Sequence, residues 1–308
     1  MKLLDGHCDT LLGLHFSGAP VGALADNQLH IDLKRASGFE HYGQLFAIFG
    51  IPEMAPDGDI FDILYSRFLA EMDACVDQVR FCRSQADAML ARQEGKSAAF
   101  LSVEGAEVLG CRIEKLEQAA EKGVISLCLT WNRPTVLTGS CSEDKDRGLS
   151  KEGEDYVRRA SELGMVLDVS HLSDPAFWDL EKLLDGPFIA SHSNSRAVFG
   201  HPRNLTDDMF RAIRDHGGTA GLNLYAAFLG EGDVSIDDTL RHVEHFLELG
   251  GEKTLAIGGD LDGCEKLPEG MHGVQDVKLL YEQLQLRGYP EMLLEDIFYR
   301  NLLRVLPE

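Results

Sequence analysis

Histidine and carboxylate side chains stand where short apolar runs of this sequence end. Six residues share this placement, at the ends of five separate runs: His7, Asp9, Glu104, His171, His192 and Asp260. Imidazole nitrogens and carboxylate oxygens are ligands with which proteins hold divalent metal ions. Six such ligands suffice for two metal ions with an open position for water, and the two oxygens of Glu104 suit it to bridge them. The pattern therefore predicts a two-metal centre.

Each of these signals is weak by itself. The pair His7-x-Asp9 puts two side chains on one side of a strand, because alternate residues face the same way, but such pairs occur by chance in many proteins. A single glutamate after a strand, like Glu104, is most often a helix cap or a solvated side chain. The prediction depends on their combination with His171 and His192, which end successive predicted strands.

Arg203 lies in the loop His-Pro-Arg-Asn after the second of these histidines and admits two interpretations. Its planar guanidinium group can bind a substrate carboxylate through two parallel hydrogen bonds. An ordinary surface arginine would give the same sequence pattern, and spacing alone does not decide between them. The histidines outside the predicted metal site are interpreted as structural, with His242 and His245 solvated on a helix.

The elements that must position these residues alternate between strands and helices. Eight apolar runs are typical of buried parallel strands: 2–6, 45–50, 98–103, 124–129, 165–169, 188–190, 219–224 and 255–258. Their alternation with helical segments predicts one α/β domain over residues 1–308, a (β/α)8 TIM-like barrel with the metal site at the carboxyl ends of its strands. An open doubly wound sheet is disfavoured, because no G-x-G-x-x-G motif follows the first strand.

Helical periodicity accounts for the segments between the strands. From Asp59 to Arg92, apolar residues recur at three- and four-residue steps, which predicts one long amphipathic helix. Further helices are expected over 154–163, from Asp174 onward, near 206–208 and over 290–305.

Composition and charge disfavour several classes of partner. The chain has 308 residues, an apolar fraction of 44% and a formal net charge of -22. A strongly acidic protein without a basic cluster is not expected to bind nucleic acid or an anionic membrane. The start of the sequence leaves no room for a leader before His7, and the seven cysteines include no Cys-x-x-Cys pair, so a cytoplasmic protein with free thiols is expected.

The motifs around these residues resemble the membrane (renal) dipeptidase family of zinc dipeptidases. The matching segments occur in family order and span nearly the whole chain: Asp-Gly-His-Cys-Asp-Thr (5–10), Val-Glu-Gly (103–105), Leu-Thr (129–130), Asp-Val-Ser-His-Leu-Ser (168–173), Ala-Ser-His-Ser (190–193), Arg-Asn-Leu-Thr-Asp-Asp (203–208), Gly-Gly-Asp-Leu-Asp-Gly (258–263) and Asn-Leu-Leu-Arg-Val (301–305). Together they are far more specific than any one of them alone.

The resemblance implies a ligand set and a substrate. It divides the metal ligands between two zinc ions, with His7, Asp9 and Asp260 on the first, His171 and His192 on the second, and Glu104 shared by both. Arg203 matches the family arginine that holds the terminal carboxylate of a dipeptide. Family members hydrolyse dipeptides, often with a D-residue at the C-terminal position, and some open β-lactam rings. Without a leader or a lipid-anchor signal, the chain is similar to the soluble bacterial members.

One position departs from the family pattern. After Leu129 and Thr130, animal members have a histidine that helps to polarise the substrate carbonyl, and this chain has Trp131. Indole offers one N–H donor and carries no charge at neutral pH. Oxyanion stabilisation would then depend on the metal ions, on Trp131 or on its neighbour Asn132. Tyr225, which follows the seventh predicted strand, completes the expected substrate-binding residues.

These observations together predict a zinc-dependent metallopeptidase. A hydroxide bridging two zinc ions would attack the peptide bond of a dipeptide, with Asp260 and Glu104 as catalytic carboxylates and Asp260 taking the proton. The alternatives are a related metal-dependent amidohydrolase acting on N-acyl amino acids, lactams or lactones, and a barrel without catalytic activity that binds a small ligand through Trp131. The expected partner is the small dipeptide substrate, and a homodimer is left open.

Overall fold

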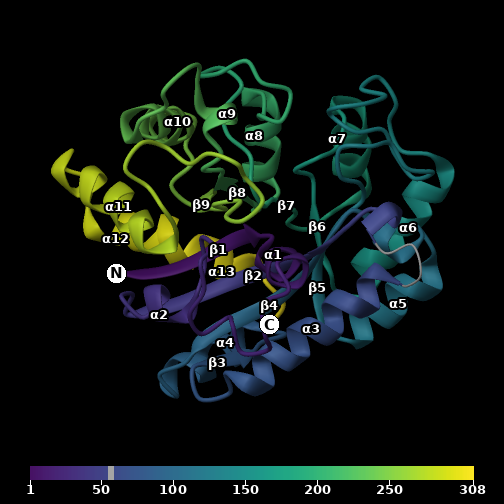
Figure 1. Cartoon of the computed structure of the whole chain (residues 1–308). Helices are drawn as coiled ribbons and strands as arrows, with labels where there is room; N and C mark the ends of the chain where they lie inside the picture. Colours follow the sequence, from purple (N-terminus) through teal and green to yellow (C-terminus); the bar gives the residue numbers. More distant parts are fainter. Residues whose placement is uncertain (55–58) are drawn as a thin grey trace.

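The computed structural model describes residues 1–54 and 59–308. Its strands form one parallel sheet, and eight of them close into a ring surrounded by helices (Figure 1). The ring consists of β1 (Lys2–Cys8), β2 (His41–Phe49), β4 (Ser97–Glu104), β5 (Val124–Cys128), β6 (Val166–Asp168), β7 (Ile189–Ala190), β8 (Thr219–Leu222) and β9 (Leu255–Ile257). It closes because β1 pairs with both β2 and β9, while β2 also pairs with β4. The predicted TIM-barrel fold is confirmed.

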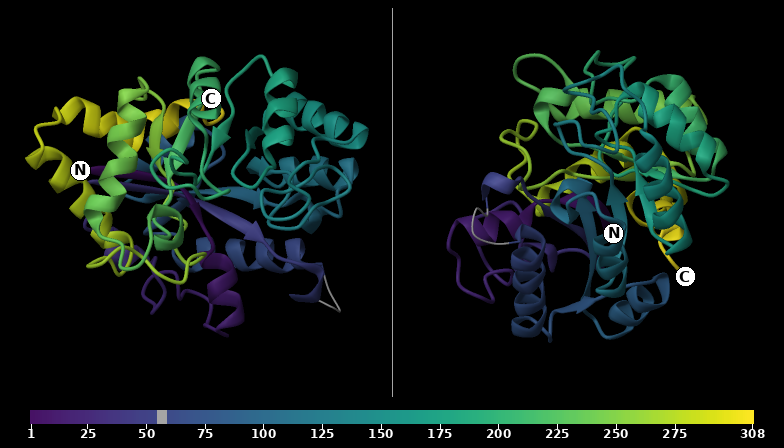
Figure 2. Two further views of the ribbon diagram at one scale, coloured as in Figure 1. Left: turned by 90° about the horizontal axis from the view of Figure 1, so that it is seen from above. Right: turned by 90° about the vertical axis from the view of Figure 1, so that its right-hand side faces the viewer.

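Helices connect the strands and lie outside the ring in both views of Figure 2. They are α1 (Thr10–Phe16), α2 (Leu33–Ala36), α3 (Ile60–Ala74), α4 (Gln85–Gln93), α5 (Ile113–Glu121), α6 (Lys151–Glu162), α7 (Asp174–Leu183), α8 (Asp207–Asp215), α9 (Ala226–Leu229), α10 (Ile236–Glu248), α11 (Val277–Leu286), α12 (Glu291–Glu295) and α13 (Asn301–Val305), with short helical turns η1 (Pro52–Met54), η2 (Ala106–Leu109), η3 (Val274–Asp276) and η4 (Asp296–Arg300). No helix in the described part of the chain is both long and apolar enough to cross a membrane.

The prediction of one helix from Asp59 to Arg92 is wrong. Helix α3 begins after Asp59, whose side chain accepts hydrogen bonds from the first turn, and it ends at Ala74. The chain then forms β3 (Val79–Phe81), which pairs with the start of β4 outside the ring, before α4 begins. Val79 and its neighbouring cysteines are buried, as the helical pattern predicted. However, they lie in or next to a turn and a short strand rather than in a helix. Apolar positions spaced by three or four residues fit both backbones.

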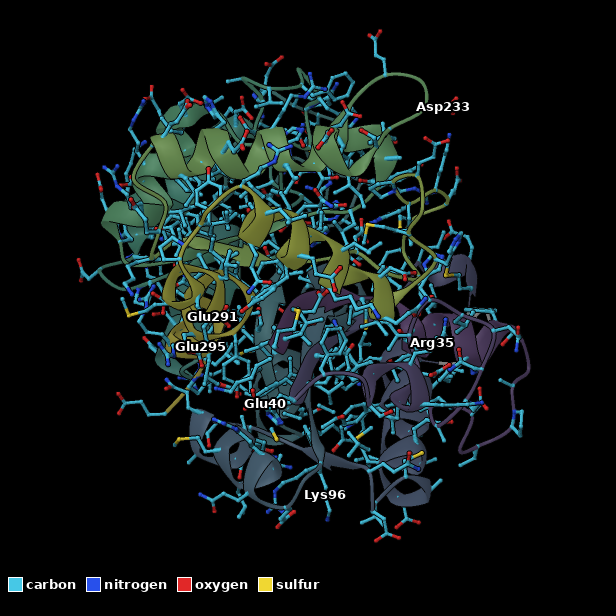
Figure 3. All side chains as sticks on the ribbon, turned by 90° about the vertical axis from the view of Figure 1, so that its left-hand side faces the viewer. Arg35, Glu40, Lys96, Asp233, Glu291 and Glu295 are labelled. Carbon is cyan, nitrogen blue, oxygen red and sulfur yellow. The ribbon has the colours of Figure 1, made fainter. Side chains whose placement is uncertain are left out.

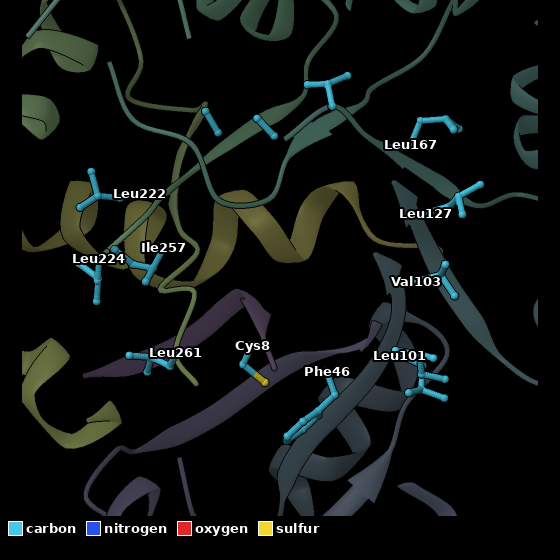
Figure 4. Close-up of a cluster of buried hydrophobic side chains, with 14 of the residues drawn as sticks. Cys8, Phe46, Leu101, Val103, Leu127, Leu167, Leu222, Leu224, Ile257 and Leu261 are labelled. Carbon is cyan, nitrogen blue, oxygen red and sulfur yellow. The ribbon is translucent and has the colours of Figure 1, made fainter. Parts of the chain in front are cut away.

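Side chains alternate between the two faces of each barrel strand, and this alternation decides which residues reach the interior. On β4, Leu101 and Val103 lie in a buried apolar cluster between strands and helices, together with Cys8 and Leu127 (Figure 4). Glu104, one residue beyond Val103, therefore points to the opposite face and into the mouth of the barrel.

The end of the chain closes the amino end of the barrel. The helix predicted over 290–305 is a continuous run of α12, η4 and α13, in which η4 is a π-helical turn. Leu302 and Val305 pack in one buried cluster with strand residues from around the ring, among them Leu4, Leu45 and Phe100. This apolar layer separates the barrel interior from solvent at the end opposite to the strand carboxyl termini.

Charged side chains surround this closed end. Glu40 and Glu295, both labelled in Figure 3, pair with basic residues: Lys2 lies 2.6 Å from Glu295, and Arg92 lies 3.0 Å from Glu40. Partly exposed pairs of this kind contribute little to stability one by one. The buried polar groups are concentrated at the other end of the barrel.

The prediction that His242 and His245 are solvated is wrong. His242 on α10 is fully buried; its Nδ1 accepts the Ser195 N–H at 3.1 Å, and its Nε2 donates to the Leu229 carbonyl at 3.0 Å. Burial lowers the pKa of His242 to about 4. His245 is half-buried and pairs with Asp207 at 2.8 Å. Both rings therefore tie α10 to neighbouring segments.

We expect His242 to make the protein less stable as the pH falls. Its folded-state pKa of about 4 lies below the unfolded value of 6.5, so between these values the unfolded chain binds the proton more readily and the free energy of unfolding decreases. From pH 6.5 to pH 5, the wild type should lose about 1.5 kcal/mol more than His242→Gln in urea unfolding. The exposed His272→Gln variant should behave as the wild type. Parallel curves for all three proteins would contradict this expectation.

Candidate metal centre and active site

The six predicted metal ligands come together at the carboxyl ends of β1, β4, β6, β7 and β9. All six side chains are buried, and their ligand atoms form three overlapping groups in which these atoms lie within 4.8 Å of one another: His7, His192 and Asp260; Glu104, His171 and His192; and His7, Asp9 and Glu104. Parallel barrel strands present their carboxyl ends at one rim, so residues far apart in the sequence become neighbours there.

A glycine lets β9 approach the strand end that carries His192. A Cβ atom on Gly258 would lie 1.7 Å from the carbonyl oxygen of Ser191, so only glycine fits this separation. Two residues later, Asp260 has a left-handed backbone with φ of 55°. Aspartate is among the residues that tolerate this conformation best. The close approach and the turn together bring the Asp260 carboxylate beside His192.

Hydrogen bonds and burial determine where His171 and His192 carry their protons. His171 Nδ1 faces the side-chain oxygen of Asn132 at 3.1 Å, while Arg203 Nη2 lies 3.1 Å from its Nε2 and can only donate. Burial, with repulsion from Arg203 and His7, holds the pKa of both histidines well below the usual value. His171 is therefore neutral, and its Nε2 presents a lone pair.

These lone pairs make the arrangement suitable for a cation. The Nε2 atoms of His171 and His192 face each other at 3.0 Å, and Glu104 Oε1 lies 2.8 Å from the first and 3.6 Å from the second. Buried acceptors this close repel one another unless a positive charge lies among them. Two imidazole nitrogens and a carboxylate oxygen are a donor set that a divalent metal ion accepts.

The ligand atoms of His7, Asp9 and Glu104 also require a positive charge among them. Within residues 1–54 and 59–308, three of these atoms are buried and find no hydrogen-bond partner: His7 Nε2, Asp9 Oδ1 and Glu104 Oε2. His7 Nε2 lies 3.5 Å from Asp9 and 3.4 Å from Glu104. Burial raises the pKa of Glu104 to about 7 and that of Asp260 to about 6. The nearby Asp9 carboxylate raises both values further, whereas His7 lowers them. Burial disfavours charge on His7, but Glu104 and Asp9 outweigh it and raise its pKa well above the usual value. A bound cation would relieve this crowding of carboxylates.

Arg203 is not a surface residue, so one of its two interpretations is wrong. It is buried beside the metal-ligating cluster, with its guanidinium 5.5 Å from the centre of the Phe228 ring. Nη2 lies 3.4 Å from the carbonyl oxygen of His192, whereas Nη1 is buried and has no hydrogen-bond partner among the residues that the structure describes. An unpaired cationic N–H at this place is suited to an incoming anionic group.

Trp131 and Asn132 differ in how they face the site. The Trp131 ring packs on Phe49 at 4.7 Å and lies 6.5 Å from the His171 ring, and its backbone N–H donates to Glu107 at 3.2 Å. Asn132 directs its side-chain oxygen to His171 Nδ1. The contact of Asn132 is thus to a predicted ligand, while the partly exposed indole of Trp131 lies next to that ligand.

Tyr225 contacts Phe228, the aromatic residue that also lies beside Arg203. Its ring lies 4.8 Å from that of Phe228, and its hydroxyl is 3.4 Å from Glu265.

Asn223, two residues before Tyr225, contacts the ligand cluster directly. It donates to Asp260 Oδ2 at 2.9 Å and to the carbonyl of His192 at 3.3 Å. The sequence analysis did not include Asn223, although its place just after β8 matches that of the predicted ligands.

The sequence analysis also missed the polar residues behind the two neighbouring histidines. Asp168, Ser170 and Ser191 are buried and hydrogen-bonded to one another. A signal was present, because His171 and His192 are each preceded by a serine at a predicted strand end. A repeated Ser-His pair on adjacent strands marks hydroxyl groups that can reach the same buried acceptor.

Fold and site together define a class of protein, the (β/α)8 barrels with metal-ligating side chains at the carboxyl ends of the strands. The family is then given by the match of residues 1–308 to the model of the membrane dipeptidase family, peptidase family M19, and the chain belongs to that family. It is accordingly a metallopeptidase of the dipeptidase type.

Relatives agree with this assignment. An uncharacterized protein in the pqqA 5' region of Klebsiella pneumoniae is 34% identical over 263 residues, 81% of this chain and 97% of the relative. A solved dipeptidase AC of family M19 has a TM-score of 0.89 and 29% identity, covering 99% of this chain and 97% of its own. A metallopeptidase from Rhodobacter sphaeroides, liganded with a phosphinate mimic of the dipeptide L-Ala-D-Ala, has a TM-score of 0.90 and 28% identity, covering 99% and 98%.

Replacement of Glu104 by glutamine should weaken metal binding. Glu104 belongs to two of the three ligand groups, and a neutral amide is a poor ligand in its place. We expect affinity for divalent ions to fall by at least ~10-fold, the loss that follows even from removing a residue that only supports a ligand. Glu107→Gln is the matched control, because Glu107 is a largely buried carboxyl with a pKa raised by burial to about 7 and belongs to none of these groups. Equal metal content in both variants, measured by elemental analysis, would refute the assignment.

Proposed function

We propose that the protein is a binuclear zinc dipeptidase that hydrolyses the peptide bond of dipeptides, including those with a C-terminal D-residue. The observation that carries this proposal is the unpartnered guanidinium nitrogen of Arg203 beside the buried ligand cluster. A carboxylate bound there would put the adjacent peptide bond against the metal centre. The relative that was solved with a mimic of L-Ala-D-Ala supports the substrate class and the D-residue.

The metal-holding residues would act as two overlapping sets. Glu104, His171 and His192 would hold one ion, and His7, Asp9 and Asp260 the other, with Glu104 shared by both. When bound, two divalent ions lower the pKa of water and polarise a carbonyl group, which supplies both the nucleophile and the stabilisation of the developing negative charge. Three histidines and three carboxylates are a donor set suited to zinc, which accepts both nitrogen and oxygen ligands.

Asp260 would transfer the proton from the attacking water to the leaving amine. Asn223 holds one of its oxygens at 2.9 Å, which fixes the plane of the carboxylate beside the ligand cluster. A carboxylate fixed within hydrogen-bond reach of the attacking water can accept its proton and pass it to the leaving amine.

Arg203 and Trp131 would orient the substrate. Arg203 is held in place by the His192 carbonyl and by the Phe228 ring, so its free nitrogen has a defined direction. A carboxylate held at this depth restricts the substrate to one residue beyond the scissile bond. Trp131 packs on Phe49 near His171 and would contact the N-terminal residue of the dipeptide, in place of the charged polarising group that a histidine would provide.

We also propose a cytoplasmic location. All seven cysteines are free in the structure, and six of them are buried. A protein with this many unpaired thiols fits a reducing compartment.

A dipeptide panel is the direct test of this function. We expect turnover of L,L- and L,D-dipeptides, its loss after metal removal by a chelator, and its return with about two equivalents of zinc per chain. Asp260→Asn should reduce kcat by at least ~100-fold, the low end for loss of a general acid–base group. Full turnover without metal would rule the mechanism out, and preferential hydrolysis of N-acyl amino acids would favour an amidohydrolase of the same fold.

A second prediction isolates the role of Arg203. Loss of one side of a buried charge pair costs about 2–5 kcal/mol, so Arg203→Met should lower kcat/KM for a dipeptide by roughly 30-fold or more. The wild type should discriminate against the corresponding dipeptide amide by a similar factor, and the variant should not. Metal content is measured on both proteins as the control. Equal discrimination by wild type and variant would show that Arg203 does not bind the carboxylate.

A further inference from the structure

A chain of buried hydrogen bonds lies behind His192. The Ser191 hydroxyl is 2.7 Å from His192 Nδ1 and also contacts Asp168 Oδ2. The other oxygen of the same carboxylate, Asp168 Oδ1, accepts the backbone N–H of Ser170 and of Ser191, each at 3.0 Å, and the Ser170 hydroxyl at 2.7 Å. All of these residues are buried, so water does not compete for the contacts.

The direction of each hydrogen bond in this chain is determined by its members. A carboxylate offers only acceptors, and a hydroxyl has a single proton. Ser191 therefore donates its proton to Asp168 Oδ2, and its oxygen is left to accept one from His192 Nδ1. The neutral imidazole has one N–H, which is then on Nδ1. His192 Nε2, which faces His171 and Glu104, is left with a lone pair.

We propose that Asp168 is a positioning residue for the metal centre, which acts through the Ser191 hydroxyl to keep His192 in the tautomer whose Nε2 can bind a metal ion. The tautomer itself follows from the chain's own hydrogen bonds; its consequence for metal binding rests on the proposed function. A neutral residue of the same shape in place of Asp168 would fill the space and impose the opposite tautomer.

Asp168→Asn tests this because the orientation of the new amide is forced. Two backbone N–H groups and the Ser170 hydroxyl point at one position, so the amide oxygen must occupy it. The amide NH2 group then faces Ser191 and donates to its oxygen. The Ser191 proton then has two acceptors within reach, His192 Nδ1 at 2.7 Å and the Ser170 hydroxyl oxygen at 3.1 Å. The Ser170 oxygen already accepts the backbone N–H of His192 at 3.2 Å, so the nearer imidazole nitrogen takes the proton, and the imidazole proton moves to Nε2, where it blocks the ligand atom. Charge, not shape, is what the substitution removes.

The first measurement is the tautomer of His192 in the metal-free protein, from its 15N chemical shifts at pH 8, with His192→Gln used to assign the signal. We expect Nδ1–H in the wild type and Nε2–H in Asp168→Asn. The second is titration with zinc alone, in which Asp168→Asn should bind one ion 10–100-fold more weakly, about the range for loss of a residue that orients a ligand. Neither measurement uses a dipeptide, so failure of the peptidase proposal would be seen separately.

A rescue experiment separates this role from simple destabilisation. In Asp168→Asn/Ser191→Ala no hydroxyl can donate to His192 Nδ1, so the double variant should bind zinc more tightly than Asp168→Asn alone. A merely structural role predicts that the second substitution adds to the loss. Asp5→Asn is the matched control: Asp5 is also fully buried and accepts two backbone N–H groups, of His7 at 3.0 Å and Gly259 at 2.9 Å, both through Oδ1, but no hydroxyl links it to a histidine. It should leave the His192 tautomer unchanged.

Two results would overturn the proposal. One is an Nδ1–H signal for His192 that persists in Asp168→Asn, and the other is weaker zinc binding by the double variant than by Asp168→Asn. If Asp168→Asn does not fold, Ser191→Ala decides the matter. Without the acceptor, His192 should change from a single Nδ1–H form to a mixture of both tautomers, and an unchanged single form would refute the role of the chain.

Discussion

The structure depends on the cost of burying mutually repelling polar groups at one end of a barrel. Six side chains with nitrogen or oxygen ligand atoms lie within a few ångströms of one another and away from water. Such an arrangement is unfavourable unless the backbone holds it in place and cations compensate its charge. Parallel strands provide the first condition, because their paired backbones fix where each one ends. Burial and the nearby Asp9 carboxylate raise the pKa of Glu104 and of Asp260, which shows the cost that a cation would offset.

Two buried aspartates anchor the loops that carry the ligands, and they do so in the same way. Asp5 accepts the backbone N–H of His7 and of Gly259, and so joins the loop after β1 to the loop after β9. Asp168 accepts the backbone N–H of Ser170 and of Ser191, and joins the loops after β6 and β7. Each carboxylate thus aligns two adjacent strand ends, and each pair of loops carries ligands on both sides.

The sequence was sufficient for those parts of the molecule in which a local pattern has one physical meaning. Eight short apolar runs, five of them ending in a histidine or carboxylate, predicted all eight ring strands, because a short buried run between helical segments is typical of a parallel strand. The segment around Val79 was mispredicted because the spacing of its buried residues fits a helix as well as a turn followed by a strand. His242, Asn223 and Asp168 were missed or misplaced because their partners come from distant segments, which no single stretch of sequence contains.

The terminal helix fills the amino end of the barrel with apolar side chains, and this has a consequence for how substrate and products enter and leave. With Leu302 and Val305 packed against the strands, apolar side chains fill this end of the barrel, so substrate would reach the predicted metal ligands from the carboxyl ends of the strands and products would leave on the same side. Under the proposed function the C-terminal amino acid, held deepest by Arg203, would depart after the N-terminal one. Its free form would then compete with fresh substrate for Arg203, and release of this product, rather than bond cleavage, would limit turnover.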